Sequence, residues 1–156
     1  MPDNGSVPDG RTRENKKQKT RKTYGIGEKQ FRSYFEKASH TKGVTGQRLL
    51  QLLETRLDNI VFRLGFAPSR KAARQLVLHR HIMVNDRLVN IPSYMIRVGD
   101  VVQIKEKSRQ LDCIHASLSA ASQRPAVPWL DLDKTTLKGS LMEMPVRESI
   151  PTPVQE

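Results

Sequence analysis

Apolar residues recur at helical spacing from Leu49 to Leu64, and the pattern then changes to that of short strands. The first stripe predicts a single helix that begins near Thr45, a residue suited to an N-cap, and ends at Gly65. Ser69 predicts the cap of a further helix. The residues that this helix would bury are Ala72, Ala73, Leu76 and Val77. Helices are also predicted at residues 28–38 and around 115–122.

Strands are predicted after the central helices. Their residues are 82–84, 87–89, 101–104, 129–133 and 139–145. The first two predict a hairpin, because Asn85 and Asp86 between them tolerate the positive φ angles of a type I′ turn. Apolar and acidic residues alternate along residues 129–133, which predicts a half-exposed strand. Residues 139–145 are its predicted partner.

The chain has no acidic residue between Asn59 and Asn85. The basic residues of this acid-free window are Arg63, Arg70, Lys71, Arg74 and Arg80, with His79 and His81 beside them. One charge sign in a segment that otherwise predicts helix and strand is typical of a phosphate-facing surface. The formal net charge of +11 indicates nucleic acid or an anionic membrane as a partner. A membrane is disfavoured, because no apolar run approaches the roughly 20 residues of a spanning helix.

Residues 1–22 predict a disordered basic arm. Residues 11–23 hold seven basic residues against one acid and lack apolar periodicity, so we expect them to order only on a polyanion. Residues 125–156 have three basic and five acidic residues, so the positive surplus belongs to the preceding part of the chain.

The sequence motifs that could indicate catalysis, metal binding or nucleotide binding are weak. Cys113 is the single cysteine, which excludes an internal disulfide and a multi-cysteine zinc site. Asp131 and Asp133 share one face of a predicted strand and fit a solvated surface better than an acid–base pair. Gly25-Ile26-Gly27 lacks the lysine of a phosphate-binding loop. We therefore predict no catalytic residues, no metal, no cofactor and no enzymatic activity.

A resemblance to a known family is carried by residues 56–104, RLDNIVFRLGFAPSRKAARQLVLHRHIMVNDRLVNIPSYMIRVGDVVQI. This segment resembles the RNA-binding domain of the small-subunit ribosomal protein conventionally numbered four, in its bacterial type. The segments EKQFRSYFEKA, KGVTGQRLLQLLETRLDN and VPWLDLD resemble the same family in the same order. The resemblance covers roughly residues 20–153. Relative to the family the chain is shortened at both ends.

The resemblance implies an α+β fold. A small helical domain would carry an inserted RNA-binding domain, in which helices pack on a small bent antiparallel sheet. The implied parts are the disordered arm at 1–22, the first part of the helical domain at 23–53, the RNA-binding domain at 54–145 and a C-terminal return segment at 146–156. The core of the RNA-binding domain would be residues 54–104, with a linker and strands at 105–145.

Carried over by position, the resemblance implies an RNA-binding face on the helix after Ser69 and on the turn that follows it. The residues of this face are Arg70, Lys71, Arg74, His79 and Arg80. Candidates in the helical domain are Lys29, Arg32, Lys42 and Arg48.

The implied function is that of a structural rRNA-binding protein, which acts early in small-subunit assembly and supports translational accuracy. Its partners would be small-subunit rRNA and neighbouring small-subunit ribosomal proteins, with no membrane and no small-molecule substrate. The implied location is cytoplasmic and ribosome-bound, with an organellar ribosome also open.

An alternative stays open, namely a free-standing heat-shock-type RNA-binding module or an accessory domain of a pseudouridine synthase. The helices before residue 54 count against the free-standing module. The chain outside residues 54–124 is too short for a catalytic domain, which counts against the synthase.

Overall fold

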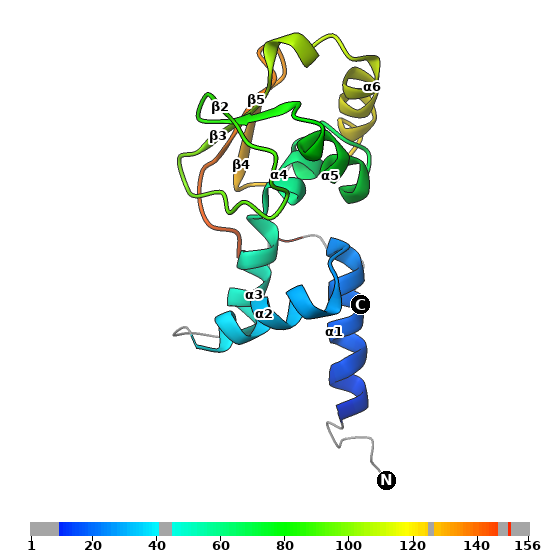
Figure 1. Cartoon of the computed structure of the whole chain (residues 1–156), viewed down its shortest axis with the longest axis vertical. Helices are drawn as coiled ribbons and strands as arrows, with labels where there is room; N and C mark the ends of the chain where they lie inside the picture. The colour runs from blue at the N-terminus through cyan, green and yellow to red at the C-terminus, as the bar shows by residue number, and fades with distance from the viewer. Residues whose placement is uncertain (1–9, 41–44, 125–126, 147–149, 151–156) are drawn as a thin grey trace.

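The computed structural model describes residues 10–40, 45–124, 127–146 and 150. Three helices form one part of the molecule, and a second part contains three further helices and a sheet (Figure 1). The α-helices are α1 (Gly10–Tyr24), α2 (Glu28–Ser39), α3 (Thr45–Glu54), α4 (Leu57–Leu64), α5 (Arg70–Leu78) and α6 (Asp112–Ala121). The strands are β1 (Ile82–Val84), β2 (Arg87–Leu88), β3 (Val101–Ile104), β4 (Leu130–Asp133) and β5 (Lys138–Leu141), and a 3-10 turn, η1, spans Glu106–Ser108. This architecture confirms the predicted α+β class.

The five strands form one antiparallel sheet in the order β2-β1-β3-β5-β4. The predicted hairpin of β1 and β2 is confirmed, and both turn residues, Asn85 and Asp86, have positive φ angles of 51° and 66°. The amide of Asn85 donates to Asp100 at 2.9 Å and its oxygen accepts from the backbone N–H of Val101 at 3.0 Å. The turn is thereby attached to the start of β3.

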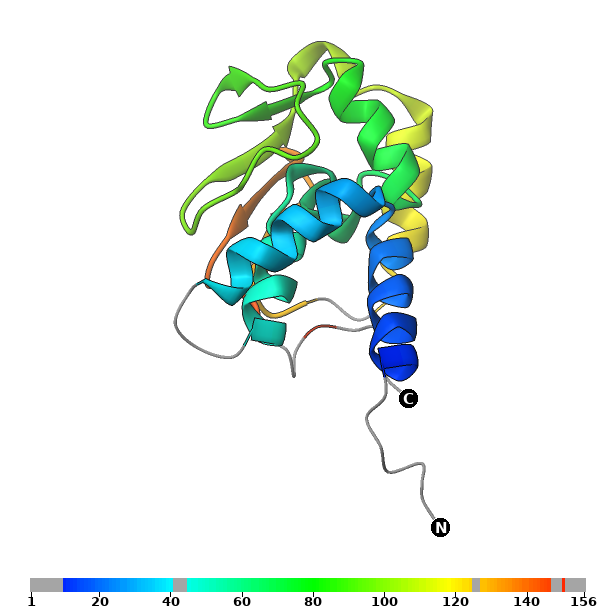
Figure 2. The ribbon, with the colours of Figure 1, turned by 60° about the horizontal axis from the view of Figure 1, so that its bottom comes forward.

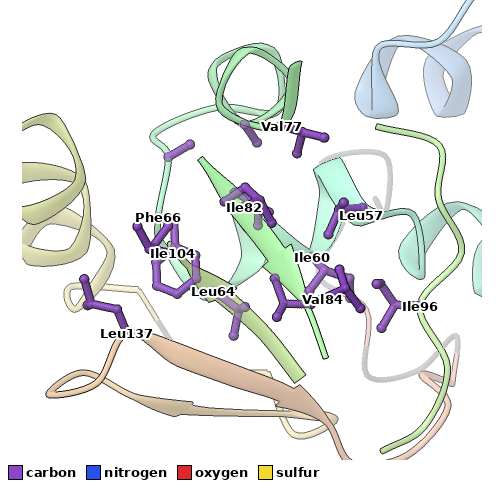
Figure 3. Packing of buried hydrophobic residues seen from close by; sticks show 14 of the residues in the cluster. Leu57, Ile60, Leu64, Phe66, Val77, Ile82, Val84, Ile96, Ile104 and Leu137 are labelled. Atoms are coloured by element: carbon purple, nitrogen blue, oxygen red, sulfur yellow. The ribbon is translucent and has the colours of Figure 1, made fainter. Parts of the chain in front are cut away.

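The buried apolar residues form two clusters. One lies among α1, α2 and α3 and includes Tyr24, Phe31 and Leu53. The other lies where α4, α5 and α6 pack on the sheet. Figure 3 shows labelled side chains from α4, α5, β1 and β3 converging in it. The predicted domain boundary at residues 53 and 54 falls between the two clusters.

The stripe of α5 is confirmed, but its residues are buried unequally. Ala73 and Val77 are fully buried, whereas Ala72 and Leu76 are only partly buried. The predicted end of the preceding helix at Gly65 and the predicted cap of α5 at Ser69 are also confirmed. Gly65 follows α4 with φ of 92°, and the hydroxyl of Ser69 accepts from the backbone N–H of Ala72 at 3.1 Å.

The single helix predicted from Thr45 to Gly65 is wrong, because the chain breaks between α3 and α4. Arg56 has an extended backbone with φ of −66° and ψ of 144°. The backbone N–H of Leu57 then donates to the carbonyl of Tyr94 at 2.8 Å instead of continuing the helix. The loop before β3 therefore supplies the acceptor of the hydrogen bond at the break. Sequence periodicity cannot predict this break, because the partner residue is distant in the sequence.

Residues 10–22 of the predicted disordered arm are helical, because α1 begins at Gly10; residues 1–9 lie outside the described residues. The segment is rich in Lys and Arg, which favour helix. The ammonium of Lys17 lies 4.4 Å from the ring centroid of Phe35 on α2. Tyr24 is buried at the end of α1, which lies beside α2 in Figure 2. Residues 10–22 are therefore ordered as a helix that contacts α2, and composition alone does not predict such contacts. In the described ranges, no helix is long and apolar enough to cross a membrane.

Candidate nucleic-acid interface

The acid-free window covers most of α4 and all of α5 and β1, and the structure divides its cations into two groups. Arg63, Arg70 and Arg74 point toward the junction between the two parts of the molecule, where they contact Glu54, Tyr24 and Gly25 outside the window. Lys71, His79 and Arg80 are exposed on α5 and the turn after it. The predicted RNA face therefore combines half-buried and exposed cations.

The junction is organised first around the carboxylate of Glu54, which is fully buried at the end of α3. It accepts hydrogen bonds from the hydroxyl of Tyr24 at 2.6 Å, the amide of Asn59 at 2.7 Å and the guanidinium of Arg63 at 2.8 and 3.2 Å. Burial, and next the charge of Glu54, raise the pKa of Tyr24 well above its usual value. Glu54 thus joins α1 to α4 through paired and neutralised groups.

Asp58 is the second buried carboxylate of the junction. It accepts two hydrogen bonds from Arg56 at 3.1 and 3.0 Å and one from Nε of Arg74 at 3.3 Å. Arg74 also donates to the backbone carbonyl of Gly25 at 2.8 Å. Arg74 therefore ties α5 to the turn between α1 and α2.

Arg70 lies one helical turn before Arg74, as the sequence predicts, but its position is also fixed internally. Its Nε donates to the amide oxygen of Asn59 at 2.8 Å. Its Cζ lies 4.7 Å from the ring centroid of Tyr24 and 4.6 Å from that of Phe62. Burial, and next the charge of the neighbouring Arg63, lower the pKa of Arg70.

These internal partners were not predicted from the sequence. The signal available was the set of charged residues that interrupt the apolar stripe of α3 and α4: Glu54, Arg56, Asp58 and Arg63. Charged side chains within a buried stripe have to be paired, so their alternating signs indicate an internal network.

Arg80 has an unusual backbone conformation. Its φ angle is 66°, in the left-handed region that favours glycine. The residue ends α5, because its N–H donates to the carbonyl of Val77 at 3.1 Å and the N–H of His81 donates to that of Leu76 at 3.1 Å. A non-glycine residue in this conformation costs roughly 1–2 kcal/mol, while the side chain stays exposed. Such a cost at an exposed cation is consistent with a role for the side chain in binding.

The candidates in the helical part lie on other elements. Lys29 and Arg32 are exposed on α2, and Arg32 pairs with Glu28 at 3.7 Å. Arg48 on α3 is half-buried and donates to Gln51 at 2.9 Å. Lys42 lies outside the described residues.

A groove of about 260 Å³ runs between α1 and α2. Its lining residues are Lys17, Gln18, Arg21, Glu28, Phe31, Arg32 and Phe35. The structure thus adds Lys17 and Arg21 of α1 to the basic side chains near Arg32, which the resemblance did not single out.

Within the ranges that the structure describes, no three His, Cys, Asp or Glu side chains come together as a metal site. The carboxylates at the junction are occupied by arginine, tyrosine and asparagine donors. The chemistry that this surface offers is the binding of anions by guanidinium and ammonium groups.

Comparison with known proteins gives two matches to family models. The family described as Ribosomal protein S4/S9 N-terminal domain matches residues 10–54, and the S4 domain matches residues 55–102. Small ribosomal subunit protein uS4 of Geobacter sulfurreducens is 56% identical over 140 residues, which are 90% of this chain and 67% of that protein. The uS4 proteins of Pelobacter propionicus and Desulforapulum autotrophicum are 53% and 55% identical over the same shares. The two family matches meet at the break between α3 and α4.

Proposed function

This chain belongs to the family of the small ribosomal subunit protein uS4, and we propose that it is a structural rRNA-binding protein of the small ribosomal subunit. The observation that carries this proposal is the identity with uS4 proteins over nine tenths of the chain. The partners are small-subunit rRNA and neighbouring ribosomal proteins, the role is non-enzymatic, and the location is the cytoplasmic ribosome. An early place in assembly and a contribution to translational accuracy form part of the same proposal.

The alternative of a free-standing or enzyme-derived RNA-binding module has less support. Such a module needs only the S4 domain, whereas the family match of this chain extends over residues 10–54 as well. The network around Glu54 and Asp58 also joins the helical part to α4 and α5. A fixed arrangement of two basic parts suits a protein that contacts RNA with both.

Within this function, the predicted RNA-binding residues take different roles. Lys71, His79 and Arg80 are exposed and free to contact phosphate. Arg70 and Arg74 add positive potential from fixed positions and also stabilise the junction. Lys29, Arg32, Lys42 and Arg48 stay candidates for a second contact from the helical part.

Cross-linking the protein to RNA in cells, followed by sequencing of the recovered RNA, tests the function. We expect small-subunit rRNA to be enriched over messenger RNA, transfer RNA and large-subunit rRNA. Recovery dominated by any of those other RNAs would contradict the proposal.

Variants of exposed residues test the site. Lys71→Ala and Arg80→Gly should each weaken rRNA binding and make the dependence on salt shallower by about one unit of slope. Arg80→Gly should leave the melting temperature unchanged or higher, because glycine adopts the positive φ angle without steric cost. Lys134→Ala, in the exposed turn between β4 and β5, is the matched control. If the control loses as much affinity as the two variants, the predicted face is misplaced.

A further inference from the structure

Among the half-buried arginines of the acid-free window, Arg70 alone has no carboxylate partner in the described part of the chain. Arg63 and Arg74 each pair with a buried carboxylate. Arg70 instead contacts two aromatic rings, with its Cζ 4.7 Å from the ring centroid of Tyr24 and 4.6 Å from that of Phe62. Aromatic rings attract a guanidinium but do not neutralise its charge. Arg70 is therefore held in place as a cation without a counter-charge.

The orientation of the Arg70 guanidinium is set by Asn59, which is fully buried in the first turn of α4. The side-chain amide of Asn59 donates to the backbone carbonyl of Glu54 at 2.8 Å and to its carboxylate at 2.7 Å. The side-chain oxygen of Asn59 accepts from Nε of Arg70 at 2.8 Å. Because an asparagine amide has two N–H donors and both are used on Glu54, its oxygen stays directed at Arg70.

This arrangement leaves the two terminal nitrogens of Arg70, Nη1 and Nη2, without protein partners. Among the described residues neither of them makes a hydrogen bond, because the single bond that Arg70 donates comes from Nε. The buried side-chain nitrogens and oxygens that lack a partner in the same residues are Nε of Arg48 and Nε1 of Trp129. The terminal nitrogens of Arg70 are therefore not buried, and their N–H donors are open to solvent.

A phosphate group is the ligand that these donors fit. The terminal N–H groups of a guanidinium lie in one plane and match the spacing of phosphate oxygens. Burial, and next the charge of Arg63, lower the pKa of Arg70, so a counter-charge favours this guanidinium more than an exposed one. A donor that is already fixed also loses less conformational freedom when it binds.

We propose that Asn59 is a positioning residue for RNA binding, which holds Arg70 so that its two terminal nitrogens meet one phosphate group of the RNA backbone. The nature of the ligand rests on the proposed function, whereas the orientation of Arg70 rests on its contacts alone. Arg70 touches the RNA, and Asn59, which is fully buried, acts through Arg70.

A purely structural role for Asn59 makes a different prediction. If Asn59 only stabilised the junction, its replacement would change RNA binding by the same factor whether or not Arg70 is present. If it positions Arg70, its replacement weakens binding only while Arg70 is present. A double-mutant cycle separates the two roles, because the effects of two changes on one shared contact are not additive.

The cycle uses the full chain and a transcript of the complete small-subunit rRNA. We expect Asn59→Ala and Arg70→Gln each to weaken binding roughly five- to tenfold. The double variant should bind no more weakly than Arg70→Gln alone. Binding is compared at a temperature at which the fluorescence of the buried Trp129 shows every variant to be folded. Losses that multiply in the double variant would overturn the proposal.

A variant that leaves Asn59 intact keeps the proposal testable if Asn59→Ala does not fold. Arg70→Lys retains the charge but loses Nε and the planar donors, so we expect roughly fivefold weaker binding with an unchanged salt slope. Arg97→Lys makes the same change at an exposed residue before β3 and should bind like the parent. Binding by Arg70→Lys at the strength of the parent, or equal losses in the two lysine variants, would overturn the proposal.

A measurement without RNA separates this inference from the proposed function. Inorganic pyrophosphate should shift the Cζ NMR signal of Arg70 in the parent and leave that of Arg97 unshifted. In Asn59→Ala the same shift should need a roughly five- to tenfold higher concentration. If these shifts occur while the parent does not select small-subunit rRNA, the positioning role stands and the ribosomal function is wrong. If the parent selects that rRNA while Arg70 does not shift, the function stands and the positioning role is wrong.

Discussion

Replacement of Glu54 by glutamine tests the junction between the two parts of the molecule. Glu54 is fully buried, and its Oε2 lies 2.8 Å from a guanidinium nitrogen of Arg63, whose side chain is only 11% exposed. Glutamine keeps the volume but removes the charge, so Arg63 would be left as a buried cation without its carboxylate. Breaking a buried ion pair in this way costs about 3–5 kcal/mol. That is a large part of the roughly 5–15 kcal/mol that stabilises an ordinary domain.

Urea unfolding measures this cost directly. Trp129 is the single tryptophan and is fully buried, so its fluorescence reports on the core of the second part. The double variant Glu54→Gln/Arg63→Gln should be more stable than Glu54→Gln alone, because it no longer buries a guanidinium that has lost the carboxylate of Glu54. Glu28→Gln is the control, since Glu28 and its partner Arg32 are both 70% exposed and their pair should contribute little. A loss below about 1 kcal/mol for Glu54→Gln would refute the reasoning.

Three further predictions follow from other contacts of the junction and core. Gly139→Ala should cost about 1–3 kcal/mol in urea unfolding, because a Cβ there would lie 2.4 Å from Cδ2 of the buried Leu64. Gly27→Ala, where a Cβ would meet nothing within 4 Å, should not show this loss. Val77→Ala should lower the free energy of unfolding by about 2–3 kcal/mol, since its fully buried side chain would leave a cavity; an unchanged melting temperature would contradict its place in the core. The folded state raises the pKa of Tyr24, so its stabilising contribution is fully present below the unfolded pKa of about 10 and is lost as pH rises above it. Tyr24→Phe should show a smaller loss of stability than the parent between pH 9 and about 11, and equal losses would exclude Tyr24 as the titrating group.

The sequence alone predicted the local features whose backbone conformation depends on one or two neighbouring residues. Gly65 and the Asn85-Asp86 turn were predicted because their positive φ angles depend on local sterics. Ser69 was predicted because its cap joins atoms only three residues apart. The family was also identified from the sequence, since it is carried by the order of residues along the chain.

Tertiary structure decided the features that depend on distant partners. Helix propensity and periodicity extend through Arg56, and only the loop that accepts the N–H of Leu57 shows why α3 and α4 are separate. Charge counting finds the arginines of α4 and α5 but not Glu54 and Tyr24, which come from other helices. The same limit applies to α1, whose basic sequence predicts disorder, because its contacts with α2 depend on the fold.

The division has one physical reason. Backbone sterics and helix caps act over a few residues, so a sequence pattern records them directly. Burial and the pairing of charges depend on which segments meet in the fold. The sequence by itself therefore determined the basic character of this protein, its class and its family. Only the tertiary structure decided which of its cations are neutralised at the junction and which, such as Lys71 and Arg80, stay exposed.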